Sequence, residues 1–249
     1  MSTFKDHFSG HAGIYREARP TYPPALFAWL AEQAPATQLA WDAGCGNGQA
    51  TLALAQHFTE VIGTDPSAAQ IANAPPHAHV AYRIEPAENS SLAAGSADLV
   101  TVAQALHWLD HARFFPEVKR VLKPGGVFAA WTYADVNTGD GAIDAVKNHL
   151  YVDLTGPYWP PERVHVDAAY RTLPFPFAEI ATPAFPMLAH WDVEHLLAYL
   201  RSWSATQRYI KANGQDPVAL VEPDLRAAWG DPARVREVRW QFHLRAGRA

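Results

Sequence analysis

The chain has 249 residues, a formal net charge of −5 and 49% hydrophobic residues. This hydrophobic fraction excludes a disordered chain, and the length accommodates one large domain or two small ones. The acidic balance argues against a nucleic-acid backbone as the main partner, and the single cysteine, Cys45, excludes a disulfide framework and a cysteine-built zinc site. Charged residues make up only 18%, which favours surface buried around an internal cavity or a ligand.

The N-terminal residues are polar and lack the apolar stretch of a signal peptide. No stretch approaches the ~18 apolar residues that a membrane span needs. The sequence therefore predicts a cytoplasmic protein with no membrane contact.

Short apolar runs alternate with helical patterns up to about residue 132. Such alternation predicts a parallel sheet with helices on both faces, a Rossmann-like three-layer sandwich. The expected strands are 38–44, 60–65, 79–85, 97–104 and 126–132, and the expected helices are 23–34, 51–58, 67–74 and 112–122.

After Trp131 the pattern changes. Residues 139–155 have helical spacing, and seven prolines between Pro157 and Pro186 are too many for a central strand or a long helix. We interpret 134–180 as a cap insertion, helical and irregular, within a single domain spanning 1–249. Two more strands, 184–191 and 234–246, flank a helix at 193–203, so the sheet should have seven strands. The arginines of the last strand are interpreted as the solvated face of an edge strand.

Three glycines at alternate positions, Gly44, Gly46 and Gly48, follow the first strand and precede a helix. Glycine there lets a ligand approach the backbone closely, although a tight turn without a ligand is the simpler alternative. Asp65 ends the second strand, where a carboxylate can accept two ribose hydroxyls. Asp42 would repel a pyrophosphate but attract a cation. The spacing also departs from the G-x-G-x-x-G of dinucleotide oxidoreductases, which stay the less favoured alternative.

Four linked motifs, DAGCGNGQAT, VIGTDPSAAQI, AENSSLAAGSADLVTVAQALHW and VLKPGGVF, resemble the class I S-adenosylmethionine-dependent methyltransferases with a type 11 domain. The resemblance covers about residues 39–131. The segments YREARPTYP (15–23) and YLRSWS (199–204) are similar to the trans-aconitate methyltransferase-like subgroup. The family implies a last strand antiparallel to the others, and S-adenosylmethionine as cofactor with S-adenosylhomocysteine as product.

The resemblance also implies positions around that cofactor. The glycines and Asp42 would lie at its methionine part, with Asp42 near the amino group. Asp65 would bind the ribose, and either Glu85 or, preferably, Glu88 would face the adenine amino group. The implied cofactor-binding residues are Asp42, Gly44, Gly46, Gly48, Asp65, Pro66, Ser67, Ala87, Glu88, Gln104, Ala105, Tyr15 and Arg19.

Twelve histidines invite a metal hypothesis, but neither His107–His111 nor His77–His79 is joined by a carboxylate in a ligand pattern. We therefore expect no metal. His107 follows the fourth strand at the carboxyl end of the sheet, where open α/β folds bind ligands, and is the candidate catalytic base. A carboxylate acceptor is already ionised and would need no base; a phenol or amine would need one.

The acceptor pocket is expected between an N-terminal lid, residues 1–22, and the insertion. Arginine matches a carboxylate in geometry, so a small carboxylic acid is the expected acceptor. The alternative to a methyltransferase is a non-catalytic cofactor-binding or regulatory protein of the same fold. We expect a monomer or homodimer without nucleic acid. The expected substrate-binding residues are Tyr22, Trp108, Trp159, Arg163 and Arg171.

Overall fold

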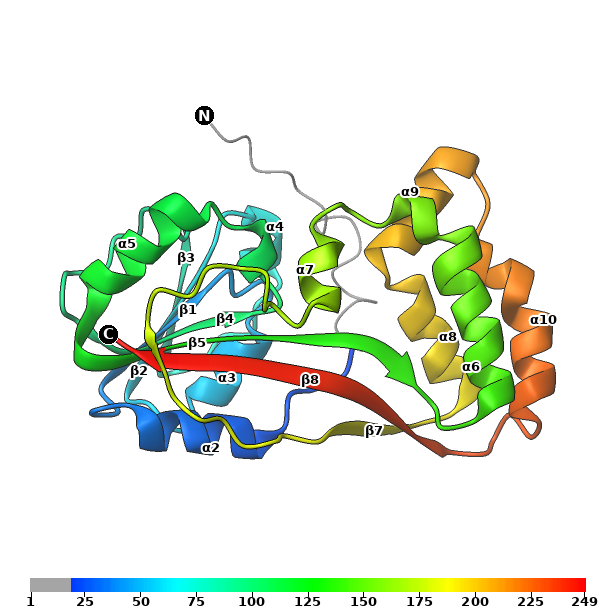
Figure 1. Cartoon of the computed structure of the whole chain (residues 1–249), viewed down its shortest axis with the longest axis horizontal. Coiled ribbons are helices and arrows are strands. Elements are labelled where there is room, and N and C mark those ends of the chain that lie inside the picture. The colour runs from blue at the N-terminus through cyan, green and yellow to red at the C-terminus, as the bar shows by residue number, and fades with distance from the viewer. Residues whose placement is uncertain (1–18) are drawn as a thin grey trace.

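Five parallel strands form the centre of the sheet in the order β3-β2-β1-β4-β5 (Figure 1). The computed structural model describes residues 19–249. These strands are apolar runs rather than alternating ones because helices cover both of their faces. They are β1 (Leu39–Ala43), β2 (Glu60–Asp65), β3 (Val80–Ile84), β4 (Ala97–Ala103) and β5 (Leu122–Asn137).

The last strand, β8 (Arg236–Arg248), pairs antiparallel with β5, as the sequence predicts. On the other side of β8, β7 (Met187–Trp191) pairs with its first half and β6 (Ala178–Glu179) with its end. The sheet therefore has eight strands where seven were predicted. Two short strands share its outermost position, and a two-residue strand leaves no periodic pattern in a sequence.

Helices cover the two faces of the sheet. Two of them, α2 (Pro24–Gln33) and α3 (Gln49–Leu54), pack on one face, and α5 (His111–Val121) packs on the other. Strand β5 supplies alternate residues to both cores: Trp131 faces α2 and Phe128 faces α5. Between β2 and β3 lies α4 (Ala68–Ala72).

A second lobe, which we call the cap, packs on the extension of β5 beyond Trp131 (Figure 1). The predicted insertion supplies only its first part, because the cap also contains residues 193–229. Helices α9 (Ser204–Asn213) and α10 (Pro217–Trp229) were not predicted from the sequence, and α10 contains Pro223 in its interior. The cap consists of α6 (Gly141–Asn148), the π-helix η2 (His149–Leu154), the 3-10 helix η3 (Gly156–Tyr158), α8 (Val193–Arg201), α9 (Ser204–Asn213) and α10 (Pro217–Trp229).

Two short helices belong neither to the helices that cover the sheet nor to the cap. The 3-10 helix η1 (Leu106–Trp108) follows β4, and α7 (Arg163–Asp167) lies between the sheet and the cap (Figure 1).

The interpretation of the terminal arginines as an edge face is wrong, because β8 lies between β5 and the β6/β7 pair. Arg245 shows the consequence. Its side chain is only 17% exposed, and it binds the backbone oxygens of Tyr170 and Leu173.

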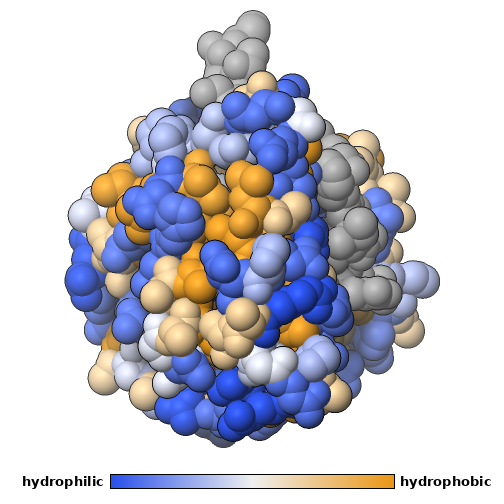
Figure 2. All heavy atoms as spheres, turned by 90° about the vertical axis from the view of Figure 1, so that its right-hand side faces the viewer, coloured by the Kyte–Doolittle hydropathy of each residue, from blue (hydrophilic) through white to orange (hydrophobic). Residues whose placement is uncertain are grey.

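The outer face of the cap carries apolar side chains at its centre, surrounded by hydrophilic ones (Figure 2). The exposed large hydrophobic residues of the cap are Val152 and Leu220. Along residues 19–249, no helix has the length and apolar character of a membrane span.

Candidate functional site

The glycine loop connects β1 to α3 and bends back over the end of β2. Its three glycines have φ values of 68°, 54° and 84°, a left-handed region that favours glycine. Gly44 and Cys45 donate their N–H groups to the Thr64 oxygen at 2.8 and 3.0 Å. Gly46 donates to Oδ2 of Asp65 at 2.9 Å. The loop is therefore fixed to the end of β2, as a shared binding edge requires.

Neighbouring side chains leave no room for a Cβ at two of these glycines. A Cβ on Gly44 would lie 2.9 Å from the Cβ of Ala105. A Cβ on Gly48 would overlap the hydroxyl of Tyr82. The loop thus packs closely against the segment after β4 and against β3, and the predicted residues of three different strands meet at one edge.

Asp65 organises the end of β2. Its Oδ1 accepts the N–H of Ser67 at 2.8 Å, while its Oδ2 accepts that of Gly46. Ser67 caps α4 by accepting the N–H of Gln70 at 3.3 Å, and Pro66 is half-buried beside it. These two bonds fix the Asp65 carboxylate between the glycine loop and the start of α4.

Asp42 lies beneath the loop and is fully buried. Thr51 donates to its Oδ2 at 2.6 Å and Thr101 to its Oδ1 at 2.9 Å. Burial raises the pKa of Asp42 to about 6, against these two hydroxyl bonds. Direct contact with a ligand's amino group stays a prediction; in this structure Asp42 holds α3 and β4 together under the loop.

The expected adenine-facing residues follow β3. Ala87 is buried, and Glu88 accepts the N–H of Asp110 through Oε1 at 2.9 Å. Glu85 accepts both the N–H and the hydroxyl of Ser91 at 2.6 Å. Each carboxylate already orders a loop, so the choice between them stays a prediction.

Gln104 directly follows β4 and has an unusual backbone conformation. It is one of three non-glycine residues of the described chain with positive φ, at 54°. Its backbone N–H bonds the Trp131 oxygen at 2.9 Å, and its amide accepts from Thr132 and donates to the Tyr133 oxygen. Such strain persists only where the surroundings enforce it, and it concentrates at functional sites.

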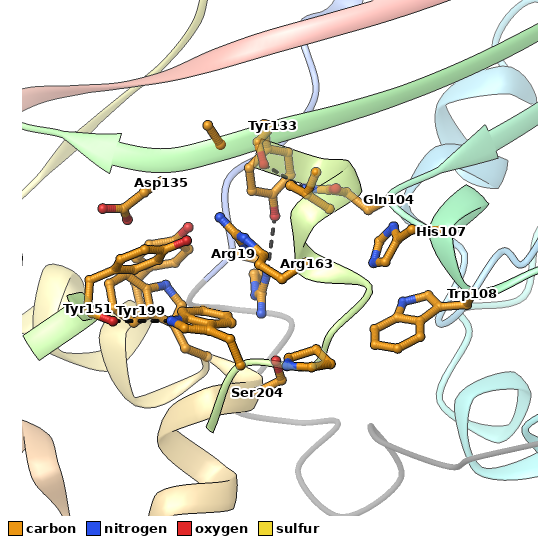
Figure 3. Close-up of a pocket in the computed structure, with 15 residues that line it drawn as sticks. Arg19, Gln104, His107, Trp108, Tyr133, Asp135, Tyr151, Arg163, Tyr199 and Ser204 are labelled. Carbon is orange, nitrogen blue, oxygen red and sulfur yellow. Dashed lines mark hydrogen bonds between the residues drawn. The ribbon is translucent and has the colours of Figure 1, made fainter. Parts of the chain in front are cut away.

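Beside Gln104, between the sheet and the cap, lies a cavity of about 80 Å³ (Figure 3). Its walls come from the residue after β4 and from β5, η1, η2, α7, α8 and α9. The lining residues are Arg19, Gln104, His107, Trp108, Tyr133, Ala134, Asp135, Tyr151, Trp159, Pro160, Arg163, Val166, Tyr199, Trp203 and Ser204.

Two guanidinium groups face this cavity (Figure 3). Arg19 donates to the Tyr133 hydroxyl at 3.2 Å and to the Ser202 oxygen at 3.1 Å. Arg163 lies 4.7 Å from the centre of the Trp159 ring and donates to Asp167 at 2.9 Å. Hydrogen bonds and ring stacking orient both cations, which lowers the entropic cost of binding an anion between them.

A buried ion pair between β5 and α6 borders the cavity. Asp135 lines the cavity, and its carboxylate pairs with Lys147. Burial raises the pKa of Asp135, while Lys147 acts in the opposite direction.

His107 lines the cavity, and its Nδ1 lies 2.8 Å from the Tyr170 hydroxyl. Burial first, and then the charge of Arg163, lower the pKa of His107 to about 3. The imidazole is therefore neutral at physiological pH and is a weak base.

The structure brings Arg19, Trp108, Trp159 and Arg163 together around one cavity, but it does not bring all predicted residues there. Arg171 is exposed and outside the cavity, so we remove it from the site. Tyr22 packs on Trp131 with ring centres 5.5 Å apart. Tyr15 and most of the expected lid, residues 1–18, lie outside the described residues.

The sequence analysis missed the cavity residues Tyr133, Asp135, Tyr199 and Trp203. A signal was present, because Tyr199 and Trp203 belong to the 199–204 segment. Tyr133 and Asp135 on β5 gave no such signal, because the predicted strand ended at residue 132.

Within residues 19–249, no three His, Cys, Asp or Glu side chains are grouped so that they could hold a metal ion. His111 bonds the Leu106 oxygen at 2.8 Å, and His79 bonds that of Thr59 at 3.0 Å.

Comparison with known proteins connects this geometry to a chemistry. Residues 41–130 match the family model described as a methyltransferase domain. A candidate methyltransferase from Dictyostelium discoideum is 33% identical over 229 residues, which cover 91% of this chain and 87% of that protein. The trans-aconitate 2-methyltransferase of Deinococcus radiodurans is 38% identical over 146 residues, 57% of this chain and 55% of the relative.

A solved structure gives the same result for the fold. A candidate type II methyltransferase from Anaeromyxobacter dehalogenans superposes with a TM-score of 0.86 at 48% identity. The alignment covers 92% of this chain and 97% of that one.

Proposed function

The chain belongs to the S-adenosylmethionine-dependent methyltransferases, and we propose that it transfers the methyl group to the carboxylate of a small organic acid. Two guanidinium groups in one cavity carry this proposal. Arg19 and Arg163 converge there, separated from the glycine loop only by the segment Gln104–Ala105. Converging cations next to the expected methyl donor favour an anionic acceptor.

The residues of the sheet edge fit the cofactor. Gly44 and Gly48 have no room for a Cβ because Ala105 and Tyr82 pack against them, so the loop keeps the bare backbone that close approach by the methionine part needs. Asp65 lies half-buried at the carboxyl edge of the sheet, next to the glycine loop, where a carboxylate can accept ribose hydroxyls. Asp42 adds a carboxyl beneath the loop, and its charge would favour a cationic ligand.

When bound, S-adenosylmethionine supplies a methyl group on a sulfonium. The leaving group is a neutral thioether, which needs no protonation. The protein therefore contributes mainly alignment, worth up to ~7–11 kcal/mol in favourable cases. Arg19 and Arg163 would orient the acceptor carboxylate, and the rings of Trp108 and Trp159 would exclude water from the cavity.

The neutral His107 supports a carboxylate rather than a phenol or an amine. A base whose pKa is about 3 removes a proton poorly at neutral pH, whereas an ionised carboxylate needs no deprotonation. The cavity's 80 Å³ has room for several water-sized groups, so it suits the carboxylate end of a small acid. The name of the Deinococcus relative, which gives trans-aconitate as its acceptor, supports the same class.

A transfer assay with methyl-labelled S-adenosylmethionine tests the acceptor class. The panel contains small carboxylic acids and size-matched phenols and amines. We expect label in the acids only, in a product that mild alkali hydrolyses, because a methyl ester is alkali-labile while a methyl ether or methylamine is not. Alkali-stable label in a phenol or amine would contradict the proposal.

Two variants of one residue test whether a base is used. Glutamine at His107 keeps an N–H donor near the position of Nε2 but has no basic nitrogen. We expect His107→Gln to retain turnover within about tenfold and His107→Ala to lose more. A loss of 10²–10⁴ in both variants, with cofactor affinity intact, would indicate general-base catalysis instead.

A further inference from the structure

The turn after α7 has a strained backbone. Ala169 and Tyr170 have φ values of 54° and 58°, two consecutive left-handed residues that are not glycine. Tyr170 is only 1% exposed, and its N–H bonds the His165 oxygen at 2.8 Å. A bulky residue rarely adopts this conformation, so contacts elsewhere must enforce it.

Arg245 on β8 supplies these contacts. Its Nη1 donates to the Tyr170 and Leu173 oxygens, both at 3.0 Å. Its Nη2 pairs with Glu179, and its guanidinium lies 4.3 Å from the centre of the Phe175 ring. One guanidinium thus holds both ends of the strained turn against the sheet.

The strained turn directs the Tyr170 hydroxyl at His107. The hydroxyl lies 2.8 Å from Nδ1, so the second ring nitrogen, Nε2, is left for the cavity that the ring lines. Figure 3 shows the imidazole facing the cavity opposite Arg163.

The direction of this hydrogen bond decides what Nε2 can do. Burial raises the pKa of Tyr170, so the phenol keeps its proton. Within residues 19–249, the hydrogen-bond partner of this buried hydroxyl is Nδ1 of His107. A buried hydroxyl proton without an acceptor is costly, so the phenol donates its proton to Nδ1. In a neutral imidazole, an Nδ1 that accepts places the proton on Nε2.

We propose that Tyr170, anchored by Arg245, is a positioning residue that fixes His107 as the Nε2–H tautomer, a neutral donor directed at the acceptor's carboxylate between Arg19 and Arg163. The part about the carboxylate rests on the proposed function, whereas the tautomer does not. The arrangement makes the cavity selective for anions, because it presents an N–H where a lone pair would repel a carboxylate.

The wild-type protein tests the tautomer directly. Imidazole ¹⁵N resonances of the histidine-labelled chain distinguish protonated from unprotonated nitrogens, and the spectrum of His107→Gln identifies the His107 signals by their loss. We expect unprotonated Nδ1 and protonated Nε2 at pH 7. A protonated Nδ1 would overturn the proposal, whatever the acceptor proves to be.

Removing the hydroxyl tests the positioning. Tyr170→Phe keeps the ring and should give a mixed tautomer signal, with the KM for the acid raised about tenfold, kcat changed less and cofactor affinity unchanged. Tyr158→Phe is the matched control: its hydroxyl bonds Asn213 at 2.8 Å outside the cavity, and this variant should match the wild type.

An unchanged tautomer and an unchanged KM in folded Tyr170→Phe would overturn the positioning role. If this variant does not fold, the wild-type spectrum still decides the tautomer. If no acid of the panel is methylated while the Nε2–H tautomer is observed, the acceptor class is wrong and the positioning stands.

Discussion

The proposed cofactor side and the proposed acceptor side of this site are built in different ways. Around the glycine loop, backbone N–H groups bind neighbouring residues, as Gly46 binds Asp65 at 2.9 Å. Around the cavity, side chains from distant parts of the chain meet, as Arg19 reaches Tyr133 at 3.2 Å across 114 positions. The first region is set by a local motif, and the second depends on how the cap packs against the sheet.

The two sides also differ in charge. The cofactor side carries the carboxyl groups of Asp42 and Asp65, and the cavity carries the guanidinium groups of Arg19 and Arg163. Opposite charges suit a cationic donor and an anionic acceptor, and each side disfavours the other's ligand. Variants should therefore separate the two binding events.

The largest expected effect is on the cofactor side. Gly48→Ala places a Cβ on the Tyr82 hydroxyl and in a left-handed conformation. We expect cofactor binding to weaken by about 2–5 kcal/mol, measured by calorimetry. Gly95→Ala is the control, since Gly95 has φ 60° and nothing within 4 Å. Adding Tyr82→Phe should restore part of the loss, and no recovery would contradict the clash.

Stability should depend on pH through Asp42. Burial raises its pKa to about 6, so between pH ~4 and 6 the native state keeps a proton that the unfolded chain has released. This group's contribution to stability is therefore lost as pH rises from ~4 to 7, by about 2–2.5 kcal/mol.

Urea unfolding of Asp42→Asn and the wild type at pH 4 and pH 7 measures this effect. The variant should gain about 2–2.5 kcal/mol relative to the wild type between the two pH values. A constant difference between the two proteins would contradict the prediction.

On the acceptor side, Arg163→Met should lower kcat/KM for the acid by about 1.5–3 kcal/mol and leave cofactor affinity within twofold. Arg239→Met is the control, because Arg239 is 69% exposed and pairs with Glu237. Transfer kinetics and calorimetry measure the two quantities. A parallel loss of cofactor affinity would show that the two sides are not separate.

The smallest expected effect is the acid sensitivity caused by His107. Its pKa is lowered to about 3, so the unfolded chain binds a proton below pH ~6.5 that the native state does not. Stability from this group is complete above pH 6.5 and falls by about 2 kcal/mol at pH 5. His107→Gln should lose this part of the pH slope in thermal unfolding, and the exposed His190→Gln should keep it.

The difference between the two sides explains what the sequence could predict. The motif around Gly44 to Gly48 and the acid at Asp65 imply a loop beside the end of the second strand, because consecutive parallel strands end at one edge. Their meeting needs only short-range connections. Helix α10 gave no such signal, since Pro217 and Pro223 lie in a segment whose helical state comes from packing against α6 and α8.

By itself, the sequence determined the parallel sheet and the close position of the glycine loop and Asp65, because hydrophobic periodicity and turn glycines act locally. The antiparallel last strand followed from the resemblance to the methyltransferase family. Only the tertiary structure decided the acceptor side. Arg163 enters the cavity and Arg171 does not, although both belong to the same insertion. Arg245, interpreted as part of an edge, instead anchors Tyr170. Such contacts join residues 70 or more positions apart, and one-dimensional periodicity carries no information about which of them will meet.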